Sequence, residues 1–248
     1  MITILNFVHR LGNQMFQIAC VTALAKRNNN EVAYPEWKYA KCFKGDFTPK
    51  KSSVVNIFKE PGFDFTKIPY SQNLSIDGYF QSEKYFKDYD KLIRDKFEPT
   101  DEIKNKLLEK YGKILEKEEI CSIHVRRGDY LNLPQHHPVM NMNYYMKAVK
   151  QIGKKYTYLI FSDDIPWCKQ NFPNIENFIF IEGQEDYEDM FLMSFCKNNI
   201  ICNSSFSWWG AWLNENKTKR IIAPKNWFGP AYAHFVLKDL YCKNWEVI

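Results

Sequence analysis

The stretch Ile120-Cys-Ser-Ile-His-Val-Arg-Arg-Gly-Asp-Tyr130 decides the interpretation of the chain. It begins as an apolar, strand-like run and then changes abruptly into two arginines, a glycine and an aspartate. In parallel α/β sheets, ligands bind at the carboxyl ends of strands, where such a change falls. Arginine carries planar, permanently charged donors that match phosphate oxygens. We therefore predict a loop that binds a diphosphate, with a surface Arg-Asp pair beside a turn glycine as the alternative.

Around this stretch, apolar strands alternate with helices. The strand candidates are 120–125, 157–162, 178–182, 199–202 and 220–223, and the helix candidates are 142–153, 165–171, 185–197 and 207–216. Such alternation is typical of a parallel sheet covered on both faces. It predicts a nucleotide-binding domain over 118–248.

The N-terminal part, 1–117, is predicted to be a smaller and more irregular α/β domain. A strand over 2–7, a turn at Gly12 and an apolar helix would aim helix N-terminal amides at an anion. The alternative is that Gly12 only makes a tight turn. Residues 35–75 are rich in proline and lysine and predict loops and short helices. We expect an α/β fold of two Rossmann-type domains facing a cleft.

Composition limits the classes of function. The 248 residues are 45% hydrophobic and 25% charged, which is typical of a folded globular protein. A net charge of +5 is too mild for a nucleic-acid-binding arm, so we expect no nucleic-acid partner; it suits anionic ligands or peripheral contact with the inner face of a membrane. The 7 cysteines include no CxxC pair and favour a reducing cytoplasm. The N-terminus lacks signal-peptide features, and no run reaches the ~20 apolar residues of a membrane span.

Polar clusters follow four of the predicted strands, and together they suit diphosphate binding. Arg126 would hold phosphate oxygens, and Ser204 and Ser205 would add donors at a helix start. Arg127, facing away on a continuing strand, would make a structural ion pair. An aspartate suits the two in-plane donors of guanine, and Asp189 is one candidate.

Other residues keep alternative interpretations at this stage. Asp163-Asp164 could cap a helix or form a magnesium dyad, although an arginine can neutralise a leaving diphosphate without metal. Trp208 could pack in the core. His136, in a loop, could approach an acceptor hydroxyl. The P-loop and GxSxG motifs are absent from the sequence.

The clusters, taken in order, resemble the α-1,2-fucosyltransferase family of GDP-fucose-dependent glycosyltransferases. The matching segments are Arg10-Leu-Gly-Asn-Gln-Met-Phe-Gln, Gly78-Tyr-Phe-Gln-Ser-Glu, His124-Val-Arg-Arg-Gly-Asp-Tyr, Phe161-Ser-Asp-Asp, Asp189-Met-Phe-Leu-Met-Ser and Asn203-Ser-Ser-Phe-Ser-Trp-Trp-Gly-Ala-Trp-Leu-Asn. They span most of the chain. The resemblance implies a GT-B-like fold, with an acceptor-side domain (1–117) and a GDP-fucose-binding domain (118–248). It also implies an inverting, metal-independent transfer without a cofactor.

The resemblance further implies roles for single residues. Arg126 would contact the β-phosphate of GDP, and His124 would lie against the nucleoside. Gly12 and Asn13 would close over the diphosphate, and Ser204 and Ser205 would bind phosphate. Related fucosyltransferases carry a guanine-binding aspartate 16 residues before a phosphate-binding serine; here 205 − 189 = 16, which selects Asp189.

The catalytic base is where the sequence departs from related enzymes. The α-1,6 relatives carry a glutamate about ten residues after the motif histidine, and this chain has Pro134 there. The resemblance then allows an SN1-like route in which the departing phosphate accepts the proton. Asp129 more readily positions the arginine loop, and Asp129 or His136 is the alternative base.

We therefore expect a galactoside α-1,2-fucosyltransferase that uses GDP-fucose and a galactose-terminated oligosaccharide or glycolipid. The catalytic candidates are Arg126, His124 and Asp129, and the acceptor candidates are His136 and Trp208. The rival hypotheses are a fucosyltransferase of another linkage or donor, and a non-catalytic sugar- or nucleotide-binding protein.

Overall fold

The computed structural model describes residues 1–117 and 119–248, which form two compact units. Unit 1 comprises Met1–Ile103 and Phe235–Cys242; unit 2 comprises Lys104–His234 and Lys243–Ile248. The domain start predicted at residue 118 lies outside the described residues. The units differ in extent from the two predicted domains, because most of helix α3 (Asp101–Leu115) belongs to unit 2.

The return of Phe235–Cys242 to unit 1 is held by specific contacts. Phe235 stacks on Phe63 with ring centroids 5.4 Å apart. Asp239, which is buried, accepts a hydrogen bond from the backbone N–H of Phe65 (3.0 Å) and pairs with Lys84. A buried carboxylate needs such partners, so this segment completes the packing of unit 1.

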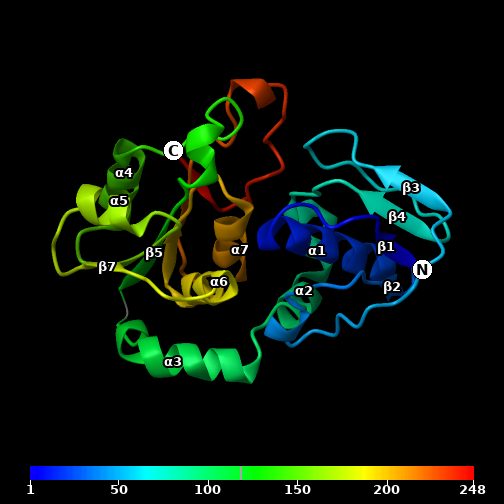
Figure 1. The fold of residues 1–248 in the computed structure, drawn as a ribbon, viewed down its shortest axis with the longest axis horizontal. Helices are drawn as coiled ribbons and strands as arrows, with labels where there is room; N and C mark the ends of the chain where they lie inside the picture. Colours follow the sequence, from blue (N-terminus) through cyan, green and yellow to red (C-terminus); the bar gives the residue numbers. More distant parts are fainter. Residues whose placement is uncertain (118) are drawn as a thin grey trace. The chain divides into compact units, whose positions relative to one another are not determined.

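Unit 1 contains a parallel four-stranded sheet in the order β2-β1-β4-β3 (Figure 1). Its strands are β1 (Ile2–Ile4), β2 (Val32–Ala33), β3 (Asn56–Lys59) and β4 (Leu74–Asp77). Its helices are α1 (Leu11–Arg27), η1 (Ala40–Cys42), η2 (Glu83–Tyr85), η3 (Lys87–Tyr89) and α2 (Asp90–Lys96). Helix α1 buries nearly every residue from Leu11 to Ala25 and ends on Lys26 and Arg27, whose charges suit a helix C-terminus.

Strand β3 corrects the expectation of only loops and short helices over 35–75. It is an edge strand whose side chains are mostly exposed, with Ile57 56% exposed. It therefore lacks the apolar alternation by which a half-buried strand is predicted. Its pairing with β4, from Asn56 opposite Leu74 to Lys59 opposite Asp77, decides its conformation.

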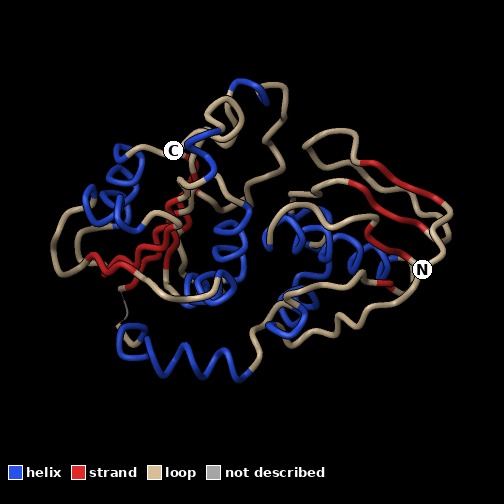
Figure 2. Tube along the Cα trace, viewed as in Figure 1, coloured by secondary structure: helices blue, strands red, loops and turns tan. Residues whose placement is uncertain are grey.

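Unit 2 contains a parallel six-stranded sheet in the order β10-β9-β8-β5-β6-β7. Its strands are β5 (Ile120–Val125), β6 (Thr157–Ser162), β7 (Phe178–Phe180), β8 (Asn198–Ile200), β9 (Ile221–Ala223) and β10 (Glu246–Val247). Its helices are η4 (Asp129–Asn132), α4 (Met142–Ile152), α5 (Ile165–Asn171), α6 (Asp186–Phe195), α7 (Ser205–Leu213) and η5 (Pro230–Tyr232), besides α3. Figure 2 shows the alternation of strands and helices.

The winding of this sheet creates a switch point between β5 and β8. The chain runs outward from β5 through β6 to β7, then returns and places β8 and β9 on the other side of β5. The crossovers are right-handed, and the chain moves across the sheet in one direction from β5 to β7 and in the other from β7 to β9. Helices α4 and α5 therefore lie on one face of the sheet, and α6 and α7 on the other (Figure 1). The α/β class, with parallel sheets covered by helices, is confirmed. No helix in the described part of the chain has the length and apolarity of a bilayer span.

Candidate active site

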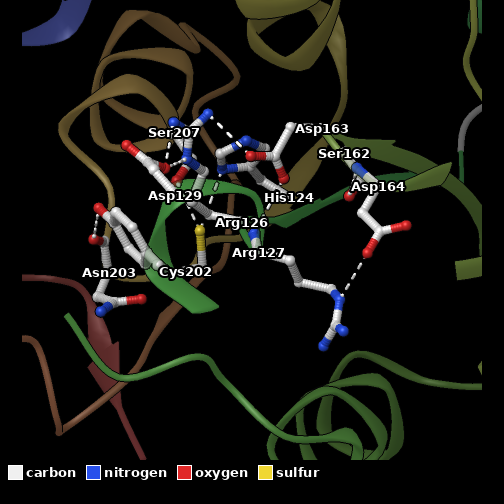
Figure 3. A network of polar contacts seen from close by, with 11 residues as sticks. His124, Arg126, Arg127, Asp129, Ser162, Asp163, Asp164, Cys202, Asn203 and Ser207 are labelled. Atoms are coloured by element: carbon white, nitrogen blue, oxygen red, sulfur yellow. Dashed lines mark hydrogen bonds and ion pairs between the residues drawn. The ribbon is translucent and has the colours of Figure 1, made fainter. Parts of the chain in front are cut away.

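Loops that follow β5, β6 and β8 meet at the carboxyl edge of the unit 2 sheet. The loop after β5 carries Arg126–Asp129, the loop after β6 carries Asp163 and Asp164, and the loop after β8 carries Asn203–Ser205. Figure 3 shows polar contacts among these loops. The carboxyl edge at a switch point is where ligands bind in open α/β sheets, so the fold brings the predicted clusters to a suitable place.

Arg126 is held between two carboxylates. Its Nε and Nη2 donate to Asp129 Oδ1 at 3.0 and 2.6 Å, and its Nη1 lies 3.1 Å from Asp163 Oδ2. Its guanidinium also lies 5.6 Å from the ring centre of Tyr130. Burial alone would lower the pKa of Arg126, but Asp163 and Asp129 raise it above its ordinary value, so the group is a fixed cation. These contacts leave two of the five N–H donors of a guanidinium for a ligand.

Gly128 allows the close approach of Asp163. A β-carbon at residue 128 would overlap Asp163 Oδ2. Asp163 Oδ1 also accepts a hydrogen bond from the backbone N–H of Arg127, at 2.9 Å. Asp163 therefore binds both the backbone of the loop and the Arg126 side chain, a contact that sequence reasoning missed because it depends on the neighbouring positions of β5 and β6.

Arg127 forms the ion pair that was predicted for it. Its Nε lies 3.0 Å from Asp164 Oδ2, and its guanidinium stacks on Trp167 at 3.9 Å from the ring centre. Asp164 also caps α5, because its Oδ1 accepts from the backbone N–H of Trp167 at 3.1 Å. The two aspartates thus bind different arginines, and among the described residues no group of three His, Cys, Asp or Glu could hold a metal ion.

His124 is buried at the end of β5 and faces α7. Its Nδ1 lies 3.1 Å from Cys202 Sγ, and its ring centre lies 5.2 Å from that of Phe206. Burial, and next the charge of Arg126, lower the pKa of His124 to about 3. The imidazole is therefore neutral in the physiological range, which fits contact with a nucleoside better than proton transfer.

The loop after β8 leads into α7, with Ser204 as N-cap and Ser205 as first helical residue. The side chain of Ser204 makes no capping hydrogen bond, so its hydroxyl is not committed to the helix. Asn203 links three loops: its Nδ2 donates to Pro138 O (2.9 Å) and Trp227 O (3.0 Å), and its backbone O accepts from Tyr130 Oη (3.0 Å). The serines stand at a helix start, as expected for phosphate donors.

Asp189 lies in the first half of α6. Among the described residues no contact joins it to the loop Arg126–Asp129, which we call the arginine loop. Its Oδ1 is buried and has no hydrogen-bond partner in the described part of the chain. Burial, then the charges of Glu188 and Asp186, raise the pKa of Asp189 to about 7. A buried carboxylate oxygen without a partner costs free energy, so the position suits a ligand that brings donors.

The acceptor candidates have different outcomes. Trp208 is 0% exposed and packs against Trp209, Trp212 and Trp245, so the expectation of an acceptor contact is corrected in favour of core packing. His136 is half-buried, and its ring packs edge-on against that of Tyr232 with ring centroids 5.0 Å apart. Its role toward the acceptor stays a prediction.

Gly12 and Asn13 lie in unit 1, in the first turn of α1. Asn13 Oδ1 accepts from Gln81 Nε2 at 2.8 Å, which ties the helix start to the loop after β4. The approach of these two residues to a diphosphate stays a prediction.

Comparison with known proteins identifies the family. The model of glycosyl transferase family 11 matches residues 46–248. The chain belongs to glycosyl transferase family 11. An O-antigen biosynthesis glycosyltransferase of Escherichia coli is 36% identical to this chain. The match covers 65% of this chain and 58% of the length of that relative. An alpha-1,2-colitosyltransferase of Escherichia coli is 31% identical over 88% of this chain and 89% of its own length.

Two further proteins match the chain at lower identity. Galactoside alpha-(1,2)-fucosyltransferase 1 of Homo sapiens is 23% identical over 84% of this chain and 64% of its own length. The crystal structure of NodZ alpha-1,6-fucosyltransferase, soaked with GDP-fucose, superposes with a TM-score of 0.58 at 15% identity, over 91% of this chain and 95% of that one. At that identity the structural likeness shows the shared fold.

Proposed function

We propose that this chain transfers L-fucose from GDP-β-L-fucose to the 2-hydroxyl of a terminal β-galactoside, with inversion and without a metal. The observation that carries the proposal is the Arg126 cation, which Asp129 and Asp163 fix at the switch point. Ser204, whose hydroxyl makes no capping hydrogen bond, stands at the start of α7 at the same edge of the sheet. Membership of a family with fucosyltransferase members supports it. A lectin would have no use for a half-buried arginine that two carboxylates orient toward a diphosphate.

In the proposed reaction, the bond between the fucose anomeric carbon and the β-phosphate oxygen breaks, and its electron pair leaves with GDP. Arg126 stabilises the charge that develops on that phosphate. The acceptor O2 then bonds to the opposite face of the anomeric carbon and loses its proton to water, while the departing phosphate takes up a proton from water. Neutral His124 contacts the nucleoside, and Asp129 keeps Arg126 in place, so this route needs no separate base.

A second donor follows from one relative. The match to the alpha-1,2-colitosyltransferase is closer, at 31% identity, than the 23% match to the human fucosyltransferase. Transfer of colitose with the same linkage is therefore the second candidate. Both candidates use the same diphosphate clamp and differ only in the sugar.

The test is a transfer assay with nucleotide-activated fucose or colitose against lactose, N-acetyllactosamine and Galβ1,3-linked acceptors. We expect fucose in α-linkage on galactose O2, as read from NMR of the product. The same linkage made only with colitose would select the second candidate. Product linked at another hydroxyl, or no product with either donor, would contradict the proposal.

Chelation tests the metal-independent mechanism separately. We expect an excess of EDTA to leave the transfer rate within about twofold, because Arg126 supplies the positive charge that a metal would otherwise bring. The control is the EDTA-treated enzyme with magnesium restored in excess. A strict requirement for magnesium would revive the Asp163-Asp164 dyad.

A further inference from the structure

We propose that His9 and Tyr79 form a binding site for the acceptor galactoside at the carboxyl edge of the unit 1 sheet. This inference rests on the proposed function and names the residues that would recognise its neutral sugar substrate. His9 follows β1 and Tyr79 follows β4, which are adjacent parallel strands in the middle of the sheet. The two loops therefore leave the same sheet edge side by side, the usual position of ligands in α/β folds.

The two rings form an exposed, ordered pair. They stack with centroids 5.6 Å apart and an interplanar angle of 19°, and His9 Nε2 lies 2.8 Å from Tyr79 Oη. Both side chains reach solvent, Tyr79 with 39% exposure. Within the described residues His9 Nδ1 has no hydrogen-bond partner, so the pair offers ring faces and a polar rim.

The side chains of buried Gln14 and half-buried Glu60 hold both loops in unfavourable backbone conformations. His9 has φ 51° and Phe80, next to Tyr79, has φ 54°, values that residues other than glycine rarely adopt. Gln14 Nε2 donates to His9 O at 2.9 Å, and Glu60 accepts from the backbone N–H groups of Tyr79 (2.7 Å) and Phe80 (3.0 Å). Strain of this kind persists where the surroundings over-determine it, and it clusters at ligand sites.

Gln17 couples the two loops to each other. It is fully buried, accepts from Val8 N–H at 3.1 Å, and donates to Asn6 O at 3.0 Å and Gly78 O at 2.9 Å. One side chain thus spans the loops after β1 and β4 and fixes their separation. The ring pair is therefore organised before any ligand arrives, which lowers the entropy cost of binding.

The chemistry of the pair suits a neutral hexopyranoside. Stacked aromatic rings match the apolar C–H face of a galactose ring, while an imidazole nitrogen and a phenol can each donate to or accept from sugar hydroxyls. A diphosphate, in contrast, is recognised by fixed cations such as Arg126. Substitutions of His9 or Tyr79 should therefore weaken binding of the acceptor and leave binding of GDP unchanged.

The test compares Tyr79→Phe and His9→Gly with the wild-type enzyme. We expect each substitution to raise the acceptor KM about tenfold, because each removes roughly one hydrogen bond to the sugar. The kcat should change less than about threefold. The dissociation constant for GDP should not change. His9→Gly also relieves the φ strain, so its Tm should be no lower than that of the wild type and misfolding cannot explain the loss.

Saturation-transfer difference NMR measures the binding of methyl β-galactoside in the presence of GDP. It distinguishes a failure of the His9–Tyr79 site from a failure of the proposed galactoside acceptor. Weaker signals in both variants than in the wild type would support the site. Equal signals in wild type and variants, or a raised GDP dissociation constant with unchanged acceptor KM, would overturn the His9–Tyr79 site alone. A wild-type enzyme that neither binds nor fucosylates a galactoside would overturn the acceptor class and this site with it.

Discussion

Arg126→Ala is expected to lower kcat by at least ~10²–10³-fold while the protein stays folded. The reason is that loss of one preorganised charge at the leaving group removes about 3–4 kcal/mol of transition-state stabilisation. Arg126→Lys should recover only part of the rate, because an ammonium lacks the planar fork that reaches two oxygens. Steady-state kinetics with saturating donor, together with circular dichroism, measure both effects.

Arg127→Ala is the matched control for this prediction. Arg127 is the neighbouring arginine, but it pairs with Asp164 and stacks on Trp167. Its loss should lower Tm and leave kcat within about threefold, since a partly exposed ion pair contributes about 1 kcal/mol. Near-normal turnover in Arg126→Ala, or equal inactivity of both folded variants, would refute the division of roles between the two arginines.

Asp189→Asn is expected to weaken GDP binding about 100-fold and at the same time to stabilise the protein. In the proposed guanine site the carboxylate would accept from two donors of guanine. An asparagine would turn a donor toward one of them, and a buried mismatch of this kind costs about 1–3 kcal/mol. The pKa of about 7 means that burying this charge opposes folding above the ordinary pKa of aspartate. Removing the charge should raise the free energy of unfolding at pH 8 by roughly 2–4 kcal/mol.

The pH dependence of GDP affinity is a second test of Asp189. Guanine requires the ionised form, so GDP affinity should rise up to pH about 7 and then level off, given the raised pKa of Asp189. Below that pH, affinity should fall by up to tenfold per unit in the wild type, and this dependence should vanish in Asp189→Asn. Asp186→Asn, on the same helix, is the control and should change GDP affinity less than about twofold. Unchanged GDP binding in Asp189→Asn would remove Asp189 from the guanine site.

Much of the unit 2 fold could be predicted because its strands are buried on both faces. The runs that become β5 and β6 were predicted with their observed bounds, and β7, β8 and β9 within two residues. The helices between them are amphipathic or apolar enough to be recognised by period. Strands β3 and β10 were missed, since short edge strands with exposed side chains leave no apolar pattern.

The polar clusters at the sheet edge could be predicted from the sequence, but the contacts within them could not. Arg126 and Arg127 could be told apart by alternation, yet the bond from Arg126 to Asp163 depends on β5 and β6 being neighbours. Trp208 shows a different limit: a tryptophan-rich segment has the same sequence pattern whether it binds a sugar or fills a core. His9 has no motif of its own, and only its φ angle and its partner Tyr79 draw attention to it.

In the proposed function, the loop Arg126–Asp129 binds the β-phosphate of a guanosine diphosphate. Calorimetric titration of GDP and GMP into the wild type and Arg126→Ala isolates that phosphate. We expect the wild type to bind GDP at least tenfold more tightly than GMP, and the difference to disappear in Arg126→Ala, since a charge-assisted contact contributes about 1.5–3 kcal/mol. The same preference for GDP in both proteins would show that the β-phosphate binds elsewhere.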